Sequence, residues 1–263
     1  FFPSKRLYMQ SGSFHAMDWS ALRLKAFAFT KEKVAASVND DNLISQSISS
    51  IEELDKAANL LVRRLREWYE LYSPEFSRSV GDNEAFVRLI LEKSKEVQLS
   101  ELGLSVSMGA DLSEEDAQEL LALAGSITSL YAQRARLEGY VQGVMHRHCP
   151  NLLILAGPTV GARLLREAGS LRRLAMEKAS TIQLFGAEKA LFRHIKTGAR
   201  PPKHGFIINH PLVTRAPAKE KGKVARALAD KLSIACKVDY FKGEPIGQSL
   251  KDALEKRFGG GSS

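Results

Sequence analysis

The fold of this chain is decided by the stretch Ile44-Ser-Gln-Ser-Ile48-Ser-Ser-Ile51-Glu-Glu-Leu54-Asp-Lys-Ala-Ala58-Asn-Leu-Leu61-Val-Arg-Arg-Leu65-Arg-Glu-Trp68, in which an apolar residue recurs every three or four positions. This spacing is nearly a heptad repeat over four heptads, and it predicts a long helix with one apolar seam. Asp40, Asp41 and Asn42 offer capping side chains at its start, and Ser73-Pro74 ends it. A helix with such a seam needs a partner along its length.

The partner is predicted further along the same chain. Ser113-Glu114-Glu115-Asp116 resembles a capping box, and an apolar seam follows it as far as Val144. We therefore expect an intramolecular antiparallel coiled coil, in which each arm of ~30 residues spans ~45 Å. A pair of ordinary bundle helices is the alternative. The seam positions predicted for the coiled coil are Ile51, Leu54, Leu61, Leu65, Trp68, Ile127, Tyr131 and Val141.

Charge is divided unevenly along the 263 residues, whose net charge is +8. Residues 1–150 carry a net −4 and residues 151–263 a net +12, and the segment from Arg163 to Arg226 alone holds 15 basic and 4 acidic residues. A basic block of this density, with its own apolar periodicity, favours a nucleic-acid partner over a merely solvated surface. The acidic half, by contrast, is expected to face protein.

Several classes of protein are excluded by what the chain lacks. Two cysteines rule out a disulfide scaffold, and no apolar run is long enough for a membrane span. Gly157-Pro-Thr-Val-Gly161-Ala-Arg163 has three residues between its glycines and no following Lys-Ser or Lys-Thr, so it is not a nucleotide-binding phosphate loop. The donors of His146-Arg-His148-Cys149 do not converge on one metal. We expect neither catalysis by this chain nor a metal or cofactor of its own.

The first 41 residues are expected to form a short α/β piece. Residues 6–9 read as a strand, and residues 17–38 mix alternating with helical spacing. A segment of this length does not form an independent core, so it packs on a neighbour or docks on another protein. Its aromatic side chains favour docking, and the candidate residues are Phe14, Trp19, Phe27 and Phe29.

After Pro150 the predicted helices become shorter, and the chain as a whole is expected to be mainly α. Helices are predicted over 160–168, 170–176, 187–196, 221–238 and 247–258, and a basic loop with two prolines over 197–204. The expected organisation is an N-terminal piece over 1–41, a coiled-coil arm over 42–148, an all-α domain over 149–258 and a flexible tail over 259–263.

The sharpest signal is the segment from Gly186 to Lys196. Gly186 lets the chain turn into a helix, on which Lys189, Arg193 and Lys196 share one face while Leu191, Phe192 and Ile195 are expected to pack inward. A helix with free N-terminal amides and a cationic stripe is suited to a phosphate backbone. Arg200, Lys203 and His204 follow in the loop, where two cations accompany a planar ring able to stack on a base.

These motifs resemble those of the Nop domain, the RNA- and protein-binding domain of the box C/D small-ribonucleoprotein scaffold proteins and of a related splicing factor. The resemblance covers about residues 42–258. It is carried by Leu61-Val-Arg-Arg-Leu-Arg-Glu-Trp-Tyr69, Gly157-Pro-Thr-Val-Gly-Ala-Arg163, Gly186-Ala-Glu-Lys-Ala-Leu-Phe-Arg193, Pro202-Lys-His-Gly205, Gly222-Lys-Val-Ala-Arg226 and Leu228-Ala-Asp-Lys-Leu-Ser-Ile-Ala235. The end of the chain after Phe258 lacks a Lys/Glu-rich tail, as in archaeal members.

The resemblance implies a non-enzymatic scaffold for RNA-guided ribose 2′-O-methylation in pre-rRNA processing. Its partners would be the methyltransferase fibrillarin, which binds S-adenosylmethionine, a box C/D guide RNA, a ribosomal-type kink-turn-binding protein and a second copy of the chain. The location implied is the cytoplasm of an archaeon or the nucleolus of a eukaryote. The residues assigned to the RNA or ribonucleoprotein surface are Gly186, Ala187, Glu188, Lys189, Arg193, Lys196, Arg200, Lys203, His204 and Arg226.

Family members often have a larger domain before the coiled coil than the 41 residues found here, which leaves fibrillarin docking open. Two alternatives to the scaffold function therefore remain. A splicing-type factor would have the Nop domain without fibrillarin binding. A pure coiled-coil interaction module would instead use its basic half to bind an acidic protein.

Overall fold

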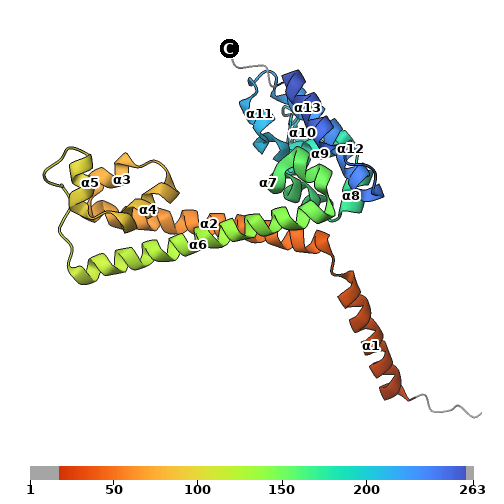
Figure 1. Cartoon of the computed structure of the whole chain (residues 1–263), viewed down its shortest axis with the longest axis horizontal. Coiled ribbons are helices and arrows are strands. Elements are labelled where there is room, and N and C mark those ends of the chain that lie inside the picture. Colours follow the sequence, from red (N-terminus) through yellow and green to blue (C-terminus); the bar gives the residue numbers. More distant parts are fainter. Residues whose placement is uncertain (1–17, 259–263) are drawn as a thin grey trace, which may run out of the picture. The chain divides into compact units, whose positions relative to one another are not determined.

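The structure is a computed structural model that describes residues 18–258, whose regular secondary structure is helical with no strand (Figure 1). The prediction of a mainly α fold is confirmed. The chain divides into two compact units, Phe1–Asn39 and Asp40–Ser263. Within the described range, no helix is both long enough and apolar enough to cross a membrane.

The elements follow one another as helices joined by short connections. Their bounds are α1 (Trp19–Ser37), α2 (Asp40–Tyr72), α3 (Pro74–Ser79), α4 (Asn83–Glu92), α5 (Lys95–Glu101), α6 (Glu114–His148), α7 (Pro150–Ala168), α8 (Leu171–Met176), α9 (Ala179–Leu184), α10 (Glu188–Thr197), η1 (Phe206–Asn209, a 3-10 helix), α11 (Pro211–Arg215), α12 (Lys221–Phe241) and α13 (Gly247–Phe258).

The first unit is described only over α1, a continuous helix. Its start is capped by Asp18, whose carboxylate accepts hydrogen bonds from the amides of Ser20 at 3.0 Å and Ala21 at 3.2 Å. Of residues 17–38, whose spacing was mixed, Trp19–Ser37 therefore form a helix rather than a strand. The strand expected over residues 6–9 lies outside the described residues.

In the second unit, α2 and α6 pack against each other as two long antiparallel helices, here called the arm (Figure 1). Ile44, Ile48 and Ile51 of α2 are buried, as are Val141, Val144 and Met145 of α6. Of the other seam positions, Leu65 and Ile127 are buried, while Leu54, Leu61 and Tyr131 are half-buried.

Toward the C-terminal end of α2, the buried positions depart from the predicted heptad seam. Trp68, assigned to the seam, keeps 36% of its surface exposed, and Tyr69 is buried in its place. Val62 is likewise buried where Leu61 is only half-buried. A helix with 3.6 residues per turn drifts by ~20° per heptad relative to a 3.5-residue seam. The assignment of Trp68 is therefore wrong by one position.

The far end of the arm, here called the tip, consists of α3, α4, α5 and the loop 102–113. The hydroxyl of Tyr69 donates to Oε1 of Gln98 at 2.7 Å, which ties α2 to α5. The guanidinium of Arg66 lies 4.0 Å over the ring of Phe86 and donates to the carbonyl of Ser77 at 2.7 Å. Helices α4 and α5 are separate, because the extended backbone of Lys93 ends the first and Ser94 begins the second.

Helices α7 to α13, with η1, form the second part of this unit, here called the helical domain. Its core is continuous with the root of the arm: Ile44 and Ile48 belong to the same buried cluster as Leu164 and Leu165 of α7 and Leu228 of α12. The arm is therefore not a separate module joined by a linker. It grows out of the domain's own core.

A buried hydrogen-bond network centred on Asp239 joins three helices of the helical domain. The carboxylate of Asp239 on α12 accepts hydrogen bonds from the backbone amides of Asn151 at 3.0 Å and Leu152 at 2.8 Å, at the start of α7. The side-chain amide of Asn151 also donates to Asp239 at 2.7 Å, and its oxygen accepts from the amides of Ile246 and Gly247 at the start of α13. Burial raises the pKa of Asp239, and these hydrogen bonds limit the rise. One carboxylate thus fixes three helices.

We predict that Asp239→Ala lowers the free energy of unfolding by about 2–4 kcal/mol, because it leaves two buried amides and the Asn151 side chain without an acceptor. The matched control is Asp230→Ala, an exposed position on the same helix, for which we expect a change within about 0.5 kcal/mol. Urea unfolding monitored by circular dichroism measures both. Equal losses of unfolding free energy in the two variants would contradict a stabilising role for the Asp239 hydrogen-bond network.

Candidate nucleic-acid interface

The turn before α10 is built on Gly186. Its φ of +85° lies in the left-handed region, and a Cβ there would stand 2.7 Å from the ring of Phe206. Its amide donates to Oε1 of Glu188 at 2.7 Å, so Glu188 holds the turn rather than projecting as a free acid. The sequence Gly186-Ala-Glu188 therefore sets the direction in which α10 begins.

The basic loop 198–205 is fastened beside this turn. The amide of Gly205 donates to the carbonyl of Gln183 at 2.9 Å, and the side-chain amide of Gln183 donates back to the carbonyl of Lys203 at 2.6 Å. A Cβ at Gly205 would lie 1.9 Å from the carbonyl oxygen of Phe185, so only glycine permits this approach. The loop and the N-terminal end of α10 are thus anchored to the same helix, α9.

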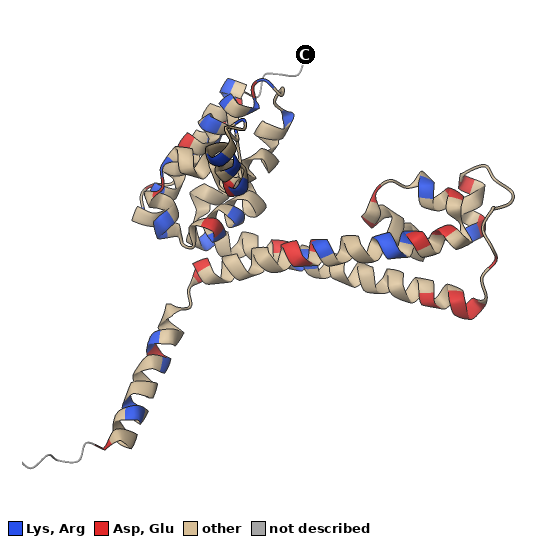
Figure 2. Cartoon of the chain, turned by 180° about the vertical axis from the view of Figure 1, so that it is seen from behind, with Lys and Arg blue, Asp and Glu red and all other residues tan. Residues whose placement is uncertain are grey.

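The predicted cations of this region are free to meet a ligand. Lys189, Arg193, Lys196, Arg200 and Lys203 are all exposed, and none of them forms an ion pair with another described residue. Figure 2 shows Lys and Arg gathered on the helical domain, whereas Asp and Glu mark the start of α6. Such uncompensated cations are the electrostatic footprint of a polyanion site. We call the face formed by α10 and residues 198–205 the basic face.

The remaining residues predicted for the RNA or ribonucleoprotein surface differ in accessibility. His204 is half-buried, and burial together with the nearby charges of Lys221 and Lys203 lowers its pKa, so the ring is neutral at pH 7. Ala187 is half-buried in the turn, and Arg226 is exposed on α12. A neutral imidazole beside free cations suits stacking or hydrogen bonding rather than ion pairing.

The apolar side of α10 corrects one prediction. Phe192 and Ile195, expected to pack inward, are 63% and 69% exposed, and Leu191 is only half-buried. No residue of α10 is buried. The physical reason is that α10 lies between two left-handed glycines, Gly186 and Gly198, which turn it away from the core. The helix therefore presents an apolar surface beside its cationic one.

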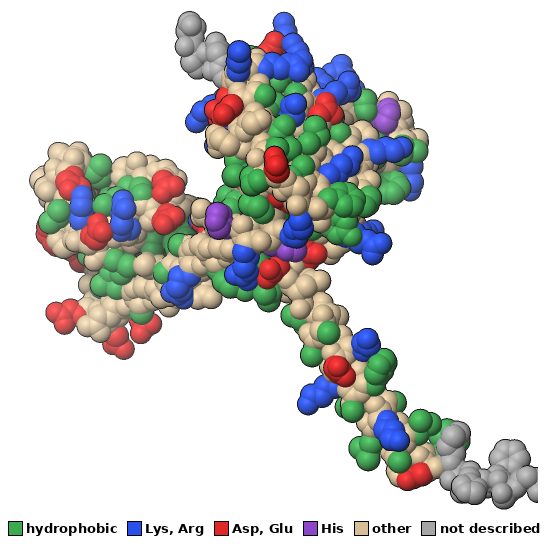
Figure 3. All heavy atoms as spheres, turned by 45° about the vertical axis from the view of Figure 1, so that its right-hand side comes forward, with side chains coloured by type: hydrophobic (Ala, Val, Ile, Leu, Met, Phe, Trp, Pro, Cys, Tyr) green, Lys and Arg blue, Asp and Glu red, His purple; other side chains and the backbone are tan. Residues whose placement is uncertain are grey.

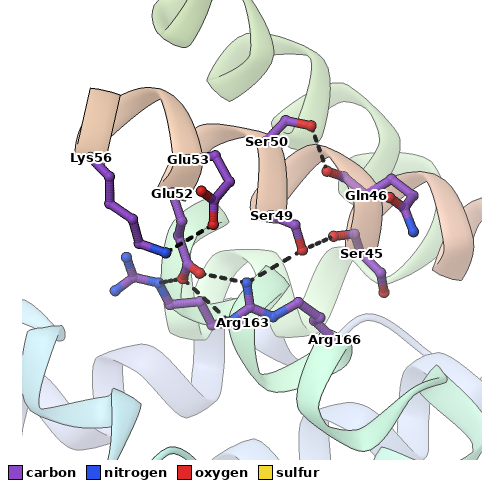
Figure 4. Close-up of polar contacts among 9 residues, drawn as sticks. All are labelled: Ser45, Gln46, Ser49, Ser50, Glu52, Glu53, Lys56, Arg163 and Arg166. Atoms are coloured by element: carbon purple, nitrogen blue, oxygen red, sulfur yellow. Dashed lines mark hydrogen bonds and ion pairs between the residues drawn. The ribbon is translucent and has the colours of Figure 1, made fainter. Parts of the chain in front are cut away.

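Two cations of the basic block are directed away from this face. Arg163 and Arg166 of α7 meet Glu52 of α2, with the shortest nitrogen–oxygen distances at 2.9 Å and 2.6 Å (Figure 4). Arg166 also approaches the hydroxyl of Ser49 at 3.5 Å. The charge count of the sequence included both arginines, and nothing in the spacing of Glu52 signalled that the arm would neutralise them.

The aromatic candidates for fibrillarin docking belong to the first unit. Trp19, Phe27 and Phe29 are 69%, 69% and 61% exposed on α1, whose surface is rich in apolar side chains (Figure 3). Phe14 lies outside the described residues. No group of His, Cys, Asp and Glu able to hold a metal is present among the residues that the structure describes.

Comparison with known proteins decides the family. The model of the Nop family, described as the snoRNA binding domain, fibrillarin, matches residues 50–259, which is most of the chain. The chain belongs to the Nop family. The resemblance stated from the motifs is therefore confirmed.

Relatives of this Nop chain are known in archaea and eukaryotes. An uncharacterized NOP5 family protein of Methanocaldococcus jannaschii is 43% identical over 82% of the chain and 56% of its own length. Nucleolar protein 56 of Saccharomyces cerevisiae is 37% identical over 88% of the chain and 51% of its own length. The crystal structure of a fibrillarin/Nop5p complex matches with a TM-score of 0.54 and 28% identity, covering 92% of this chain and 78% of that one. The chain spans about half the length of these curated relatives.

We predict that Gly186→Ala displaces α10, because the new methyl group would meet the Phe206 ring in a strained backbone. Gly198→Ala is the matched control: its φ is also positive, but nothing lies within 4 Å of the added Cβ. We expect Gly198→Ala to lower the free energy of unfolding by about 1 kcal/mol and Gly186→Ala to lower it distinctly more. Urea unfolding, with amide hydrogen exchange across 186–205, measures the difference. An equal loss of unfolding free energy in both variants would contradict the close contact between Gly186 and the Phe206 ring.

Proposed function

We propose that this chain is a non-catalytic scaffold of a box C/D ribonucleoprotein, which joins fibrillarin to a guide RNA and a kink-turn-binding protein for ribose 2′-O-methylation. Family membership supports the class of assembly. The observation that carries the proposal is α10, which presents unpaired cations and exposed apolar side chains next to each other on a helix held away from the core.

The cationic side of α10 is suited to the RNA. Lys189, Arg193 and Lys196 follow one another at helical spacing, and Arg200 and Lys203 extend the charge into the anchored loop. Because the loop and the start of α10 share the support of α9, a phosphate backbone would meet cations whose positions are already fixed. Such contacts position the RNA without reading its sequence. Recognition of sequence is left to the guide.

The apolar side of α10 is suited to a protein. Exposed Phe192 and Ile195 gain nothing from a phosphate backbone, but they would be covered by a protein bound to the same RNA. We assign this side to the kink-turn-binding protein. The RNA and its bound protein would then be recognised together, since neither side of α10 is sufficient alone.

The catalytic step belongs to the partner in this proposal. Fibrillarin would hold S-adenosylmethionine and transfer its methyl group, and the chain would only position fibrillarin relative to the RNA. We assign fibrillarin docking to the exposed aromatics of α1, Trp19, Phe27 and Phe29, and self-association to the arm. The crystal structure of the fibrillarin/Nop5p complex, which this chain matches in fold, supports a fibrillarin-binding role over a splicing-type factor.

We predict that Lys189→Glu with Arg193→Glu weakens binding to kink-turn RNA, because two phosphate contacts are replaced by repulsion. The slope of log affinity against log salt should fall by about one unit for each lost contact. Filter binding from 50 to 400 mM salt measures the slope. The matched control is Lys237→Glu, an exposed cation on α12 outside the basic face. An unchanged slope in the double variant would overturn the assignment of the basic face.

A second variant separates RNA from protein contacts. Phe192→Ser with Ile195→Ser keeps every charge of α10, so the salt slope with RNA alone should not change. Affinity should fall only when the kink-turn-binding protein is already on the RNA. A loss with RNA alone would instead place the apolar side against bases.

We predict that the chain co-purifies with fibrillarin and that Phe27→Ser with Phe29→Ser abolishes this, because these aromatic side chains lie exposed on α1. The control is Leu60→Ser, an exposed apolar position on α2. Sedimentation of the same samples reports self-association. Retention of the wild-type chain by a splicing complex and not by fibrillarin would favour the alternative function.

A further inference from the structure

The point at which the arm leaves the helical domain is marked by one acidic residue. Along α2, the buried contacts with the domain core involve Ile44, Ile48 and Ile51, and Glu52 follows directly. Among the described residues, no hydrogen bond or ion pair joins α2 to the helical domain beyond Glu52. Glu52 is therefore the outermost polar contact of α2 with the domain.

The contact at Glu52 is directional. One carboxylate oxygen, Oε1, accepts from Nε of Arg163 at 2.9 Å, while Oε2 accepts from a terminal nitrogen of Arg166 at 2.6 Å (Figure 4). The two arginines are three residues apart on α7, so the carboxylate is held between them. Burial opposes ionisation of Glu52, but the hydrogen bonds and charges of Arg166 and Arg163 outweigh it and lower the pKa of Glu52. The carboxylate is ionised at pH 7.

The apolar core beneath this contact is of a different physical kind. Hydrophobic contacts are non-directional, so they hold α2 on α7 without fixing how far it rolls or tilts. A carboxylate held by two planar guanidinium groups does restrict orientation, because each N–H must point at its oxygen. All three side chains are about one-fifth to one-quarter exposed, so the attraction between the charges is offset by the cost of removing them from water. Their effect is on geometry.

We propose that Glu52 is a positioning residue that fixes the direction in which the arm leaves the RNA-binding domain. The first part of the proposal concerns this chain alone. Its second part rests on the proposed function: the arm direction sets where a methyltransferase carried by the scaffold stands relative to the bound RNA, so Glu52 acts on methylation through geometry and not through RNA affinity.

The test measures arm direction in the chain without partners. Spin labels at Ser126→Cys on α6 and Lys237→Cys on α12 are on exposed positions of the arm and the domain, and both native cysteines are buried. Double electron–electron resonance gives the distance distribution between them. We expect Glu52→Gln, which keeps the shape and removes the charge, to broaden the distribution or shift its mean.

A matched control lies one residue away. Glu53→Gln makes the same chemical change, but Glu53 is exposed and pairs only with Lys56 of its own helix, at 2.8 Å. It should leave the distribution unchanged. The exchange variant Glu52→Arg with Arg166→Glu restores an ion pair of opposite polarity and should narrow the distribution again. A Glu52→Gln distribution identical to wild type, with the fold verified by circular dichroism, would overturn the proposal.

The second part is tested in the assembled ribonucleoprotein. With wild-type RNA affinity, Glu52→Gln should lose methylation at the guided nucleotide on the order of tenfold, since small misplacements of reacting groups are costly. A broadened distance distribution with unchanged methylation would overturn the role in catalysis while leaving the scaffold intact. Absence of assembly by the wild-type chain would instead overturn the proposed function, and the resonance result would stand independently.

Discussion

The architecture of the second unit depends on how the chain changes direction at Cys149. Helix α6 ends at His148 and α7 begins at Pro150, so a single residue separates them. The first amides of α7 have no helical partners, and the buried carboxylate of Asp239 accepts them. Without that acceptor the turn would bury unpaired donors, at a cost of about 1–3 kcal/mol each. Asn151 also accepts hydrogen bonds from the amides at the start of α13, so the positions of α7, α12 and α13 depend on one another.

The sequence made the helices and the arm predictable because both rest on local periodicity. It also identified the basic face, since residues 186–204 combine turn chemistry with cations. What it missed was decided by contacts between distant residues. Trp68 and Tyr69 are both large aromatic residues, and the drift of the seam along α2 together with the contacts of the tip determines which is buried. Phe192 and Ile195 have the spacing of a core face, but the two flanking glycines turn α10 outward. Glu52 resembles any surface glutamate until α7 is placed beside it.

The division of charge between the two halves of the chain also has a structural meaning that formal counting did not reveal. Part of the positive charge of the basic block is consumed internally, because Arg163 and Arg166 neutralise Glu52 of the acidic half. The cations of α10 and of the loop after it form no ion pair with another described residue. The cations of the basic face are thereby available to a ligand, whereas Arg163 and Arg166 are held at the junction of α7 with α2.

The isolation of α10 has a consequence for how such a chain can change over time. A helix with no buried residue, held by glycines at both ends and by a loop fastened to α9, contributes little to the core that stabilises the rest. Substitutions on its surface are therefore nearly free of folding penalties. Selection can adjust what this surface binds without first compensating a loss of stability, so binding and folding can evolve separately within one domain.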